Sequence, residues 1–522
     1  MSDYFYKVKP VLNRLCNHDI TKNLYTIRFF IRKRFKSVVD TVDPYYEIES
    51  PNYNIIPPYL ADFLIINTLK YGCINNASNS LYSFKERTKI LSILENVQNE
   101  VNKIPMRDDV ATWLKSFIFN QEKMQLGEDI RSTYCRYYKI YNNENIIKTI
   151  KNKYGTDLDE YMAMTIMLFI KFDQQFAIDF GHLKNSFKGN TRFGKIDIER
   201  FCNDIVIDIN DIHNYYKNEK QLYNEENIFY SYLDDLHVSH PLIAHNNQWL
   251  CINPVQLLHV LLGRIYYDLS DEIHIDLGSQ LEEYVNAQLS YYFSKQFDAS
   301  SGYIREFEYK TKDGKKKTSD FIIWNKDKIV FLDCKMKKIT EPGKRNQFLD
   351  MNFINTLLQS DWFKRKEWEI NVSQNKYINE YTKDILEIAK GIGKIYRCYD
   401  DYTKGLVKLP NESGESKELT VVLLSLNSLH VGLNYDLISK IAEWYRTKNG
   451  IDKRKCSFKE ISVISSIDFD HIVPCIETEG IERFINGLSW CNNDRSKNTF
   501  DNPYIRNMFD QFVNNQLKEV MS

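Results

Sequence analysis

One stretch of the 522-residue chain, residues 318–335, constrains the fold more than any other. Its two apolar runs, 319–324 and 328–334, contain mostly β-branched and aromatic residues and are separated by a short polar segment. This pattern predicts two strands joined by a tight hairpin. A turn centred between Lys326 and Asp327 fixes the register, because each residue then has one partner opposite it.

In that register two carboxylates face each other across the ladder, Asp320 and Asp333, while Ile322 faces Phe331. Opposed residues have Cβ atoms about 4.5 to 5.5 Å apart, where like charges destabilise a sheet unless something positive lies between them. A divalent cation is the natural candidate. Lys335 follows Asp333 by two residues, so it points to the same face of the strand and belongs to the same predicted site.

Hydrolysis of a phosphodiester bond requires these groups. Carboxylate oxygens hold Mg²⁺, which lowers the pKa of a bound water and neutralises charge on the scissile phosphate. An ammonium group alongside, here Lys335, can orient the attacking water and stabilise developing negative charge. A further carboxylate is available from Glu282 or Glu283 in the helix expected just upstream.

Asp320, followed after a gap of twelve residues by Asp333-Cys334-Lys335 and preceded by the helical segment 281–285, resembles the PD-(D/E)XK nuclease superfamily, to which many restriction endonucleases belong. The resemblance implies that Asp320 and Asp333 bind the metal. It further implies that the backbone carbonyl of Cys334 assists and that Lys335 is catalytic.

In the same superfamily a helix glutamate often supports the metal, and Glu282 fits that role better than Glu283. Ser319 stands where the family has proline, a position that varies. The resemblance covers about residues 241–484 and implies a restriction endonuclease-like domain that cleaves DNA with Mg²⁺, or with Mn²⁺ in its place. It suggests defence against foreign DNA by analogy alone.

The two halves of the chain have different patterns. Residues 1–235 carry apolar residues at helical spacing, which predicts a mainly α module for recognition, regulation or binding of a protein partner. Residues 236–522 alternate helices with strands, which predicts an α/β domain with a central mixed sheet flanked by helices and a helical C-terminal extension. No Gly-rich phosphate loop follows a predicted strand, so a P-loop ATPase is not expected.

Further elements are expected around the predicted hairpin. Strands are predicted at 303–310, 419–426 and 461–467, and helices at 255–269, 278–297, 381–398, 435–448 and 477–485. Two turn signals accompany them: His245-Asn246-Asn247 in a short hairpin, and Asp313-Gly314 in a hairpin that joins the strands 303–310 and 319–324.

A second motif near the C-terminus resembles the HNH nuclease pattern. It consists of Asp470-His471, then Asn486, then Asn493 or Asp494 before Lys497. The resemblance implies that His471 activates water while Asp470 and the later residue hold one metal ion. The alternative is that these residues belong to the last strand and helix of the same α/β domain, and an HNH or dual-site nuclease therefore remains open. A catalytically silent scaffold that binds nucleic acid or a protein partner is an alternative of another class.

Charge locates the expected contact with nucleic acid. The chain has a net charge of -1, so a protein that coats nucleic acid over its whole surface is excluded. Residues 305–345 nevertheless contain thirteen basic residues against seven acidic ones, which suits a phosphate backbone beside an acidic pocket. DNA is the expected partner and RNA is not excluded; the oligomeric state is left open.

The remaining composition predicts a soluble cytoplasmic protein with no membrane partner. The longest apolar stretch, 162–170, is far below the roughly 18 to 20 residues that span a bilayer. The ten cysteines form no C-x-x-C pair, which favours reduced, mostly buried thiols. Three histidines lie close together, His237, His240 and His245, but without a carboxylate cluster they favour a loop-and-strand group over a metal site.

Overall fold

The computed structural model describes residues 19–33, 58–74, 130–188, 194–218, 236–269, 271–296, 300–312, 314–336, 391–410, 417–426, 447, 461–488 and 502–517. The chain divides into two compact units. Unit 1 contains residues 1–128, 144–269 and 516–522, and unit 2 contains residues 129–143 and 270–515. This division differs from a single boundary at 235/236, because residues 236–269 pack in unit 1 and residues 129–143 pack in unit 2.

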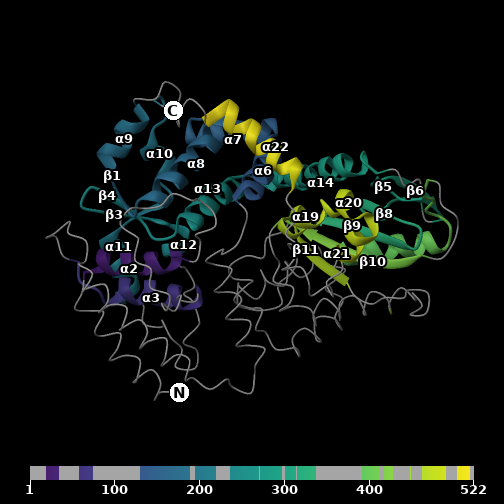
Figure 1. The fold of residues 1–522 in the computed structure, drawn as a ribbon, viewed down its shortest axis with the longest axis horizontal. Helices are drawn as coiled ribbons and strands as arrows, with labels where there is room; N and C mark the ends of the chain where they lie inside the picture. The colour runs from purple at the N-terminus through teal and green to yellow at the C-terminus, as the bar shows by residue number, and fades with distance from the viewer. Residues whose placement is uncertain are drawn as a thin grey trace, which may run out of the picture. The chain divides into compact units, whose positions relative to one another are not determined.

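Unit 1 is mainly helical, with one small sheet (Figure 1). Its helices are α2 (Ile20–Lys33), α3 (Pro58–Tyr71), α7 (Glu144–Tyr154), α8 (Leu158–Gln174), α9 (Phe180–Lys188), α10 (Ile198–Cys202), α11 (Ile209–Asn218), α12 (Leu236–Ser239) and α13 (Pro254–Asp268). Its four strands are β1 (Ala177–Asp179), β2 (Val206–Asp208), β3 (Leu242–His245) and β4 (Gln248–Cys251), in the order β1-β4-β3-β2.

The β3–β4 hairpin turns where the sequence predicts. Asn246 and Asn247 form its two-residue loop with φ of 47° and 59°, the left-handed conformation that such tight turns require. The strands β1 and β2 were not predicted. Each is three residues long, too short to give an alternating pattern in the sequence.

Unit 2 is built on a five-stranded mixed sheet flanked by helices. Its strands are β5 (Gly302–Arg305), β8 (Phe321–Trp324), β9 (Lys328–Lys335), β10 (Glu418–Ser425) and β11 (Ile461–Ser465), in the order β11-β10-β9-β8-β5. The strands β5, β8 and β9 are antiparallel neighbours, whereas β9, β10 and β11 run parallel. The predicted hairpin register is confirmed, since Ile322 pairs with Phe331 and Trp324 with Ile329.

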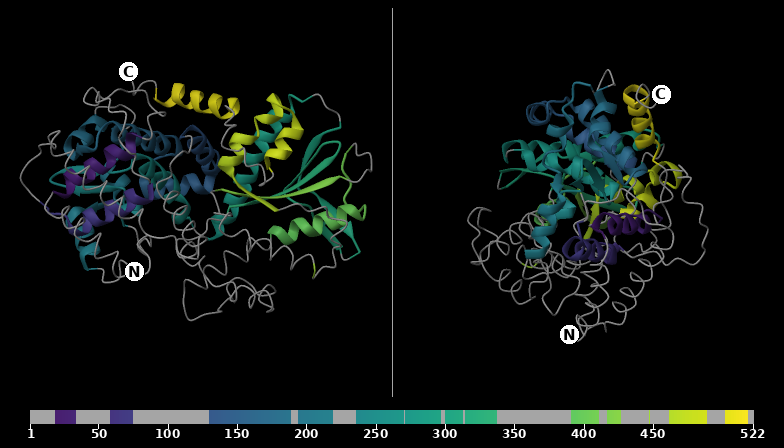
Figure 2. Two further views of the ribbon diagram at one scale, coloured as in Figure 1. Left: turned by 60° about the horizontal axis from the view of Figure 1, so that its bottom comes forward. Right: turned by 90° about the vertical axis from the view of Figure 1, so that its left-hand side faces the viewer.

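Helices cover both faces of this sheet. The helix over residues 391–403 lies along one face, and α19 (Ser466–Ile472), α20 (Cys475–Thr478) and α21 (Ile481–Leu488) lie over the other (Figure 2). Unit 2 also contains α6 (Ile130–Tyr141), α14 (Asp271–Phe293) and α22 (Pro503–Phe512), which is followed by the π-helical turn η4 (Val513–Leu517). The sheet is therefore buried on both faces, as its nearly continuous apolar strands β9 and β10 indicate.

Three predicted elements of unit 2 divide or end early, and a fourth, α14, spans Asp271–Phe293 where a helix was expected at 278–297. The expected strand 303–310 is two strands in different sheets, because β5 ends at Arg305 and β6 (Glu308–Thr311) pairs only with β7 (Gly314–Lys317). The Gly314 turn, with φ of 117°, joins β6 to β7, while Asp313 lies outside the described residues. The strand β7 was not expected in its lysine-rich run.

The other two differences lie near the C-terminus. The strand expected at 461–467 ends at Ser465, whose side chain and Asp468 form a capping box that starts α19. The helix expected at 477–485 is two helices, α20 and α21, which meet at Gly480 with φ of 88°. The helix expected at 435–448 lies outside the described residues except for residue 447.

The thiols in the described part of the chain are free, and all of them except Cys73 are buried: Cys135, Cys202, Cys251, Cys334, Cys398 and Cys475. This agrees with the expectation of reduced, mostly buried cysteines for those positions. Among the described residues no helix is long and apolar enough to cross a membrane.

Candidate functional site

The β8–β9 hairpin brings the two predicted acids together. Asp320 lies directly before β8 and Asp333 lies in β9, and the confirmed register sets them opposite each other. Asp320 is only 6% exposed and Asp333 is fully buried. Two carboxylates are therefore held in the interior of unit 2, a costly arrangement unless cations compensate their charge.

Two lysines provide that compensation. Lys335 Nζ lies 2.6 Å from Asp333 Oδ2. Lys394, from the helix over residues 391–403, lies 2.5 Å from Asp320 Oδ1 and 3.1 Å from Asp333 Oδ1. Lys335 was predicted from its place two residues after Asp333, whereas Lys394 was not predicted at all.

The two carboxylates differ in how they are held. Asp320 Oδ2 accepts a hydrogen bond from the backbone N–H of Cys334 at 2.7 Å, which fixes that side chain to β9. Among the described residues, the partners of the Asp333 oxygens are the ammonium groups of Lys335 and Lys394. Asp333 is thus a buried carboxylate whose charge is balanced by two lysines.

A third carboxylate, Glu306, belongs to the site although the sequence did not single it out. Its Oε2 lies 3.0 Å from Lys394 Nζ, and its Oε1 lies 2.7 Å from Lys317 Nζ on β7. The backbone N–H of Glu306 donates to the carbonyl of Asp320 at 2.8 Å, so the end of β5 is tied to the start of β8. Glu306 follows β5 directly, which is why it reaches the same end of the sheet.

The two candidate helix glutamates, both on α14, have different surroundings. Glu283 is exposed and pairs with Arg305 at 2.7 Å. Glu282 is partly buried and has no hydrogen bond or ion pair with a described residue. Its carboxyl group interacts electrostatically with Lys394, Glu306 and Asp333. Of the two, Glu282 is therefore the one directed toward the acidic cluster.

The charge of this cluster changes its proton affinities. Burial and the neighbouring charge of Asp333 raise the pKa of Asp320 to about 7, against the opposing effect of Lys394. Burial likewise raises the pKa of Glu282. Burial alone would lower the pKa of Lys394, but the charges of Asp333 and Asp320 outweigh it and raise that pKa above its ordinary value. Lys394 therefore stays protonated throughout the physiological range.

The raised pKa of Asp320 predicts a pH-dependent contribution to stability. Between the ordinary pKa of 3.8 and about 7 the folded protein holds a proton that the unfolded chain has released. This contribution is therefore full below the unfolded pKa and is lost as the pH rises through the folded pKa. In EDTA, Asp320→Asn should gain thermal stability relative to wild type as the pH rises from 5 to 8, measured by circular dichroism.

Asp327→Asn is the matched control, because Asp327 is exposed at the turn of the same hairpin. Its melting temperature should keep a constant difference from wild type over this pH range. A constant difference for Asp320→Asn as well would contradict the assignment of a raised pKa to this carboxyl.

Carboxylates of this kind are suitable ligands for Mg²⁺ or Mn²⁺. Oxygens of Glu306, Asp320 and Asp333 surround one nitrogen, Lys394 Nζ, at 2.5 to 3.1 Å. Within the part of the chain that the structure describes, no group of three or more His, Cys, Asp or Glu side chains has the arrangement of a metal site. In this structure the ammonium group of Lys394 occupies the position between the three carboxylates.

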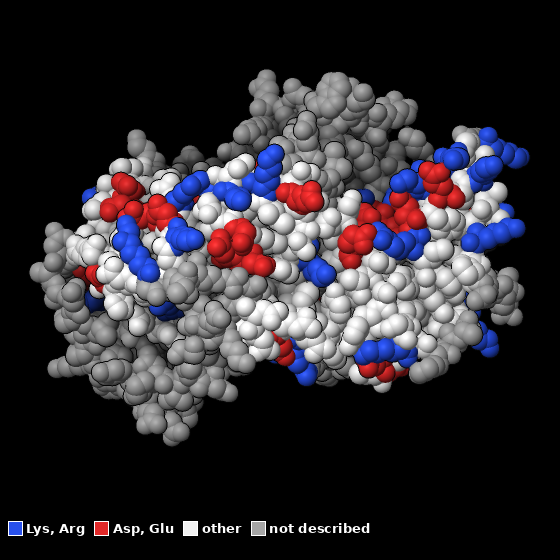
Figure 3. Space-filling view, turned by 90° about the horizontal axis from the view of Figure 1, so that it is seen from above, with Lys and Arg blue, Asp and Glu red and all other residues white. Residues whose placement is uncertain are grey.

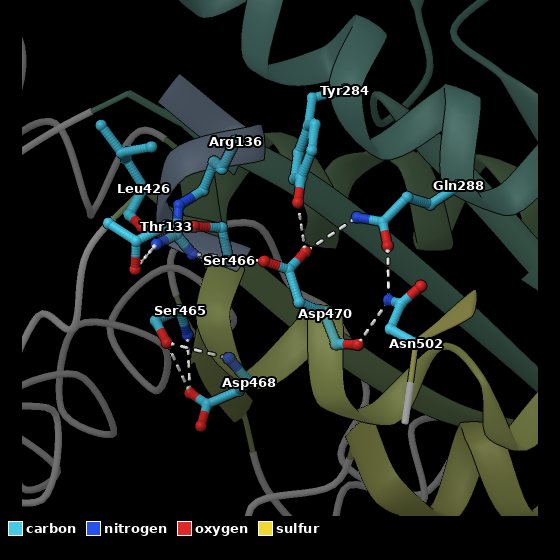
Figure 4. Close-up of polar contacts among 10 residues, drawn as sticks. All are labelled: Thr133, Arg136, Tyr284, Gln288, Leu426, Ser465, Ser466, Asp468, Asp470 and Asn502. Carbon is cyan, nitrogen blue, oxygen red and sulfur yellow. Dashed lines mark hydrogen bonds and ion pairs between the residues drawn. The ribbon is translucent and has the colours of Figure 1, made fainter. Parts of the chain in front are cut away.

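The residues of the HNH-like motif are engaged elsewhere. Asp470 is fully buried in α19, where its carboxylate accepts hydrogen bonds from Tyr284 at 2.7 Å and Gln288 at 2.8 Å (Figure 4). Arg136 of α6 pairs with its other oxygen at 3.3 Å. Asn502 donates to the Asp470 carbonyl at 2.7 Å. This network joins α6, α14 and α19 to the start of α22, which is a structural role.

The structure describes two further residues of that motif, His471 and Asn486. His471 is half-buried in α19, and the Asn486 amide oxygen accepts a hydrogen bond from Lys328. Asn493, Asp494 and Lys497 lie outside the described residues.

The three clustered histidines each have a local partner in unit 1. A ring nitrogen of His237 is hydrogen-bonded to Tyr216 at 2.8 Å, His240 to Ser239 at 3.0 Å, and His245 to the side chain of Asn246 at 2.9 Å. The expected loop-and-strand group is correct for His240 and His245, whereas His237 lies in the short helix α12.

A basic hairpin stands beside the acidic cluster. The β6–β7 pair places Lys310 opposite Lys315 in its ladder, and both side chains are exposed. On the other side of the ladder, Tyr309 donates to Asp401 at 2.7 Å and Lys316 lies 3.8 Å from the same carboxylate. Figure 3 shows basic and acidic side chains gathered at the end of the molecule that carries β5 and β6 in Figure 1.

Comparisons with protein-family models, with curated proteins and with solved structures found no match to this chain. The function must therefore be argued from the site itself.

Proposed function

We propose that unit 2 is a restriction endonuclease-like domain that hydrolyses phosphodiester bonds in DNA with Mg²⁺, or with Mn²⁺ in its place. The observation that carries the proposal is the pair of buried, opposed carboxylates, Asp320 and Asp333, with Lys335 beside them. A protein that needed this sheet only as a scaffold would gain stability from apolar residues at these positions, because buried charges are costly. A functional requirement accounts for their presence.

Asp320 and Asp333 would hold the metal, with Glu282 or Glu306 and the backbone carbonyl of Cys334 as further oxygen donors. A bound divalent ion supplies an activated water and neutralises charge on the scissile phosphate. Lys335, which is 23% exposed beside Asp333, would stabilise the negative charge that develops on the phosphate. The hydrogen bond from the Cys334 amide would keep Asp320 oriented while the substrate binds.

The β6–β7 hairpin supplies a surface for the DNA backbone. Opposed like charges destabilise a hairpin, and Glu308 balances only part of this repulsion through its ion pair with Lys315 at 3.3 Å. Neither Lys310 nor Lys312 has an ion-pair partner among the described residues, and both are exposed. Phosphate groups would relieve this repulsion, and the contacts of Asp401 would hold the hairpin in place.

The direct test is a cleavage assay with the full chain on supercoiled plasmid, linear duplex and single-stranded DNA, in Mg²⁺, Mn²⁺ or EDTA. We expect cleavage with either metal and none in EDTA. Binding without cleavage in every condition would identify a silent scaffold instead. Cleavage of RNA alone would reassign the substrate.

Lys335→Met tests the division of roles within the site. The methionine keeps the apolar stem and removes the ammonium group, so turnover should fall by about 10²-fold or more. Mn²⁺ affinity, measured by calorimetry, should not fall, because no carboxylate is lost. Lys326→Met is the control, because that lysine is exposed at the turn of the same hairpin. A collapse of Mn²⁺ affinity in Lys335→Met would show that the lysine supports the metal rather than the phosphate.

A further inference from the structure

The ammonium group of Lys394 lies where three carboxylates converge. Its nearest oxygens come from Asp320 at 2.5 Å, Glu306 at 3.0 Å and Asp333 at 3.1 Å. These acids come from three places in the sheet: directly before β8, directly after β5, and in β9. No other described lysine or arginine contacts all three, since Lys335 pairs with Asp333 alone and Lys317 with Glu306 alone within this cluster.

The helix over residues 391–403 packs closely against the sheet, and this packing places Lys394 among the three carboxylates. Gly391 lies one turn before Lys394, where the helix packs against side chains of β9 and β10. A Cβ atom on Gly391 would lie 2.9 Å from Lys335 Cε, 2.9 Å from Leu423 Cδ1 and 3.1 Å from Asp333 Oδ2. A larger residue at 391 would require the ends of the Lys335 and Leu423 side chains to shift, so the helix is packed closely against the acidic cluster.

A divalent cation held by Asp320 and Asp333 cannot share this position with Lys394. The oxygens around Lys394 Nζ already contact the ammonium, and a metal ion needs the same oxygens at about 2.0 to 2.6 Å. Two cations that close also repel each other strongly inside a protein. The Lys394 side chain is 23% exposed, so it has a route to solvent.

We infer that Lys394 is the built-in counter-ion of the metal-free site and competes with the divalent cation for it. This inference rests on the proposed nuclease function, which supplies the reason for a cation to bind. Lys394 holds the two buried aspartates in place without metal and moves aside when the metal enters. It therefore raises the metal concentration at which the site fills, and it weakens metal binding instead of assisting it.

The test compares Mn²⁺ binding to the full-length wild type and to Lys394→Met, by calorimetry and by electron paramagnetic resonance of free Mn²⁺. The variant should bind Mn²⁺ about tenfold more tightly, because the competing charge is gone. In EDTA it should melt below wild type, since Asp320 and Asp333 then keep only Lys335 as a cation. Addition of Mn²⁺ should therefore raise its melting temperature by more than it raises that of wild type.

Two further variants keep the result interpretable. Lys394→Gln retains hydrogen-bond donors without the charge, and it should show the same tighter binding even if the methionine variant folds poorly. Lys404→Met removes a lysine whose ion-pair partner among the described residues is Asp400, four residues earlier, and it should leave Mn²⁺ affinity unchanged.

Equal or weaker Mn²⁺ binding by both neutral variants, with wild type binding Mn²⁺ and cutting DNA, would overturn this inference and leave the nuclease proposal standing. Absence of Mn²⁺ binding in wild type and in both variants would overturn both proposals together.

Discussion

Asp333→Asn is expected to abolish Mg²⁺-dependent DNA cleavage, with a loss of about 10³-fold or more, while the protein remains folded. Asp333 is the fully buried acid of the pair, and among the described residues its oxygens receive only the ammonium groups of Lys335 and Lys394. Asparagine has nearly the same shape as aspartate but carries no charge and has one oxygen fewer. The variant should therefore no longer bind the divalent ion. Cleavage of supercoiled plasmid provides the measurement.

The appropriate control is Asp327→Asn, an exposed acid in the turn of the same hairpin, which should cut DNA at the wild-type rate. DNA binding in EDTA should survive in both variants, because we propose that lysines of the β6–β7 hairpin provide it. Wild-type cleavage by Asp333→Asn would remove the acidic pair from the mechanism.

Asp470→Ala is expected to destabilise the protein by about 3 to 5 kcal/mol, because breaking a buried ion pair leaves an uncompensated charge in the interior. Arg136, whose side chain is 1% exposed, would lose the carboxylate it contacts, and Tyr284 and Gln288 would lose their acceptor. Thermal unfolding followed by circular dichroism would register a fall of about 10 °C or more.

Glu482→Ala provides the comparison, since Glu482 is 73% exposed and its removal should change stability by no more than about 0.5 kcal/mol. His471→Ala, at the residue next to Asp470, should leave cleavage within a few-fold of wild type. An HNH site requires the opposite result: Asp470→Ala would keep its stability, and both variants would lose cleavage.

The acidic hairpin, β8–β9, could be predicted because the residues that determine its pairing are close together in the sequence. Two short apolar runs separated by a tight turn set the pairing of β8 and β9, and that pairing fixed the facing positions of Asp320 and Asp333. The same local logic placed Lys335 beside Asp333 and the β3–β4 turn at Asn246 and Asn247. Side chains within one hairpin are close in space because they are close in the sequence.

The rest of the site was not predictable in the same way. Lys394 lies 61 residues beyond Asp333, in a segment whose sequence indicates only a helix. Nothing in that pattern distinguishes Lys394 from the other lysines of the segment until the helix packs on the sheet. The role of Glu306 could not be predicted for a related reason. The stretch 303–310 reads as one continuous strand, but it divides into β5 and β6, which belong to two different sheets, and Glu306 lies between them.

The domain division also depended on long-range packing. The helix α6 belongs to unit 2 because Arg136 reaches Asp470, which is more than three hundred residues away in the sequence. Turn chemistry and alternation act over a few residues, so the hairpin register and the facing acids could be predicted from the sequence. The cations that meet those acids could not be predicted, because their positions depend on parallel strand pairing and on helix packing across long chain separations.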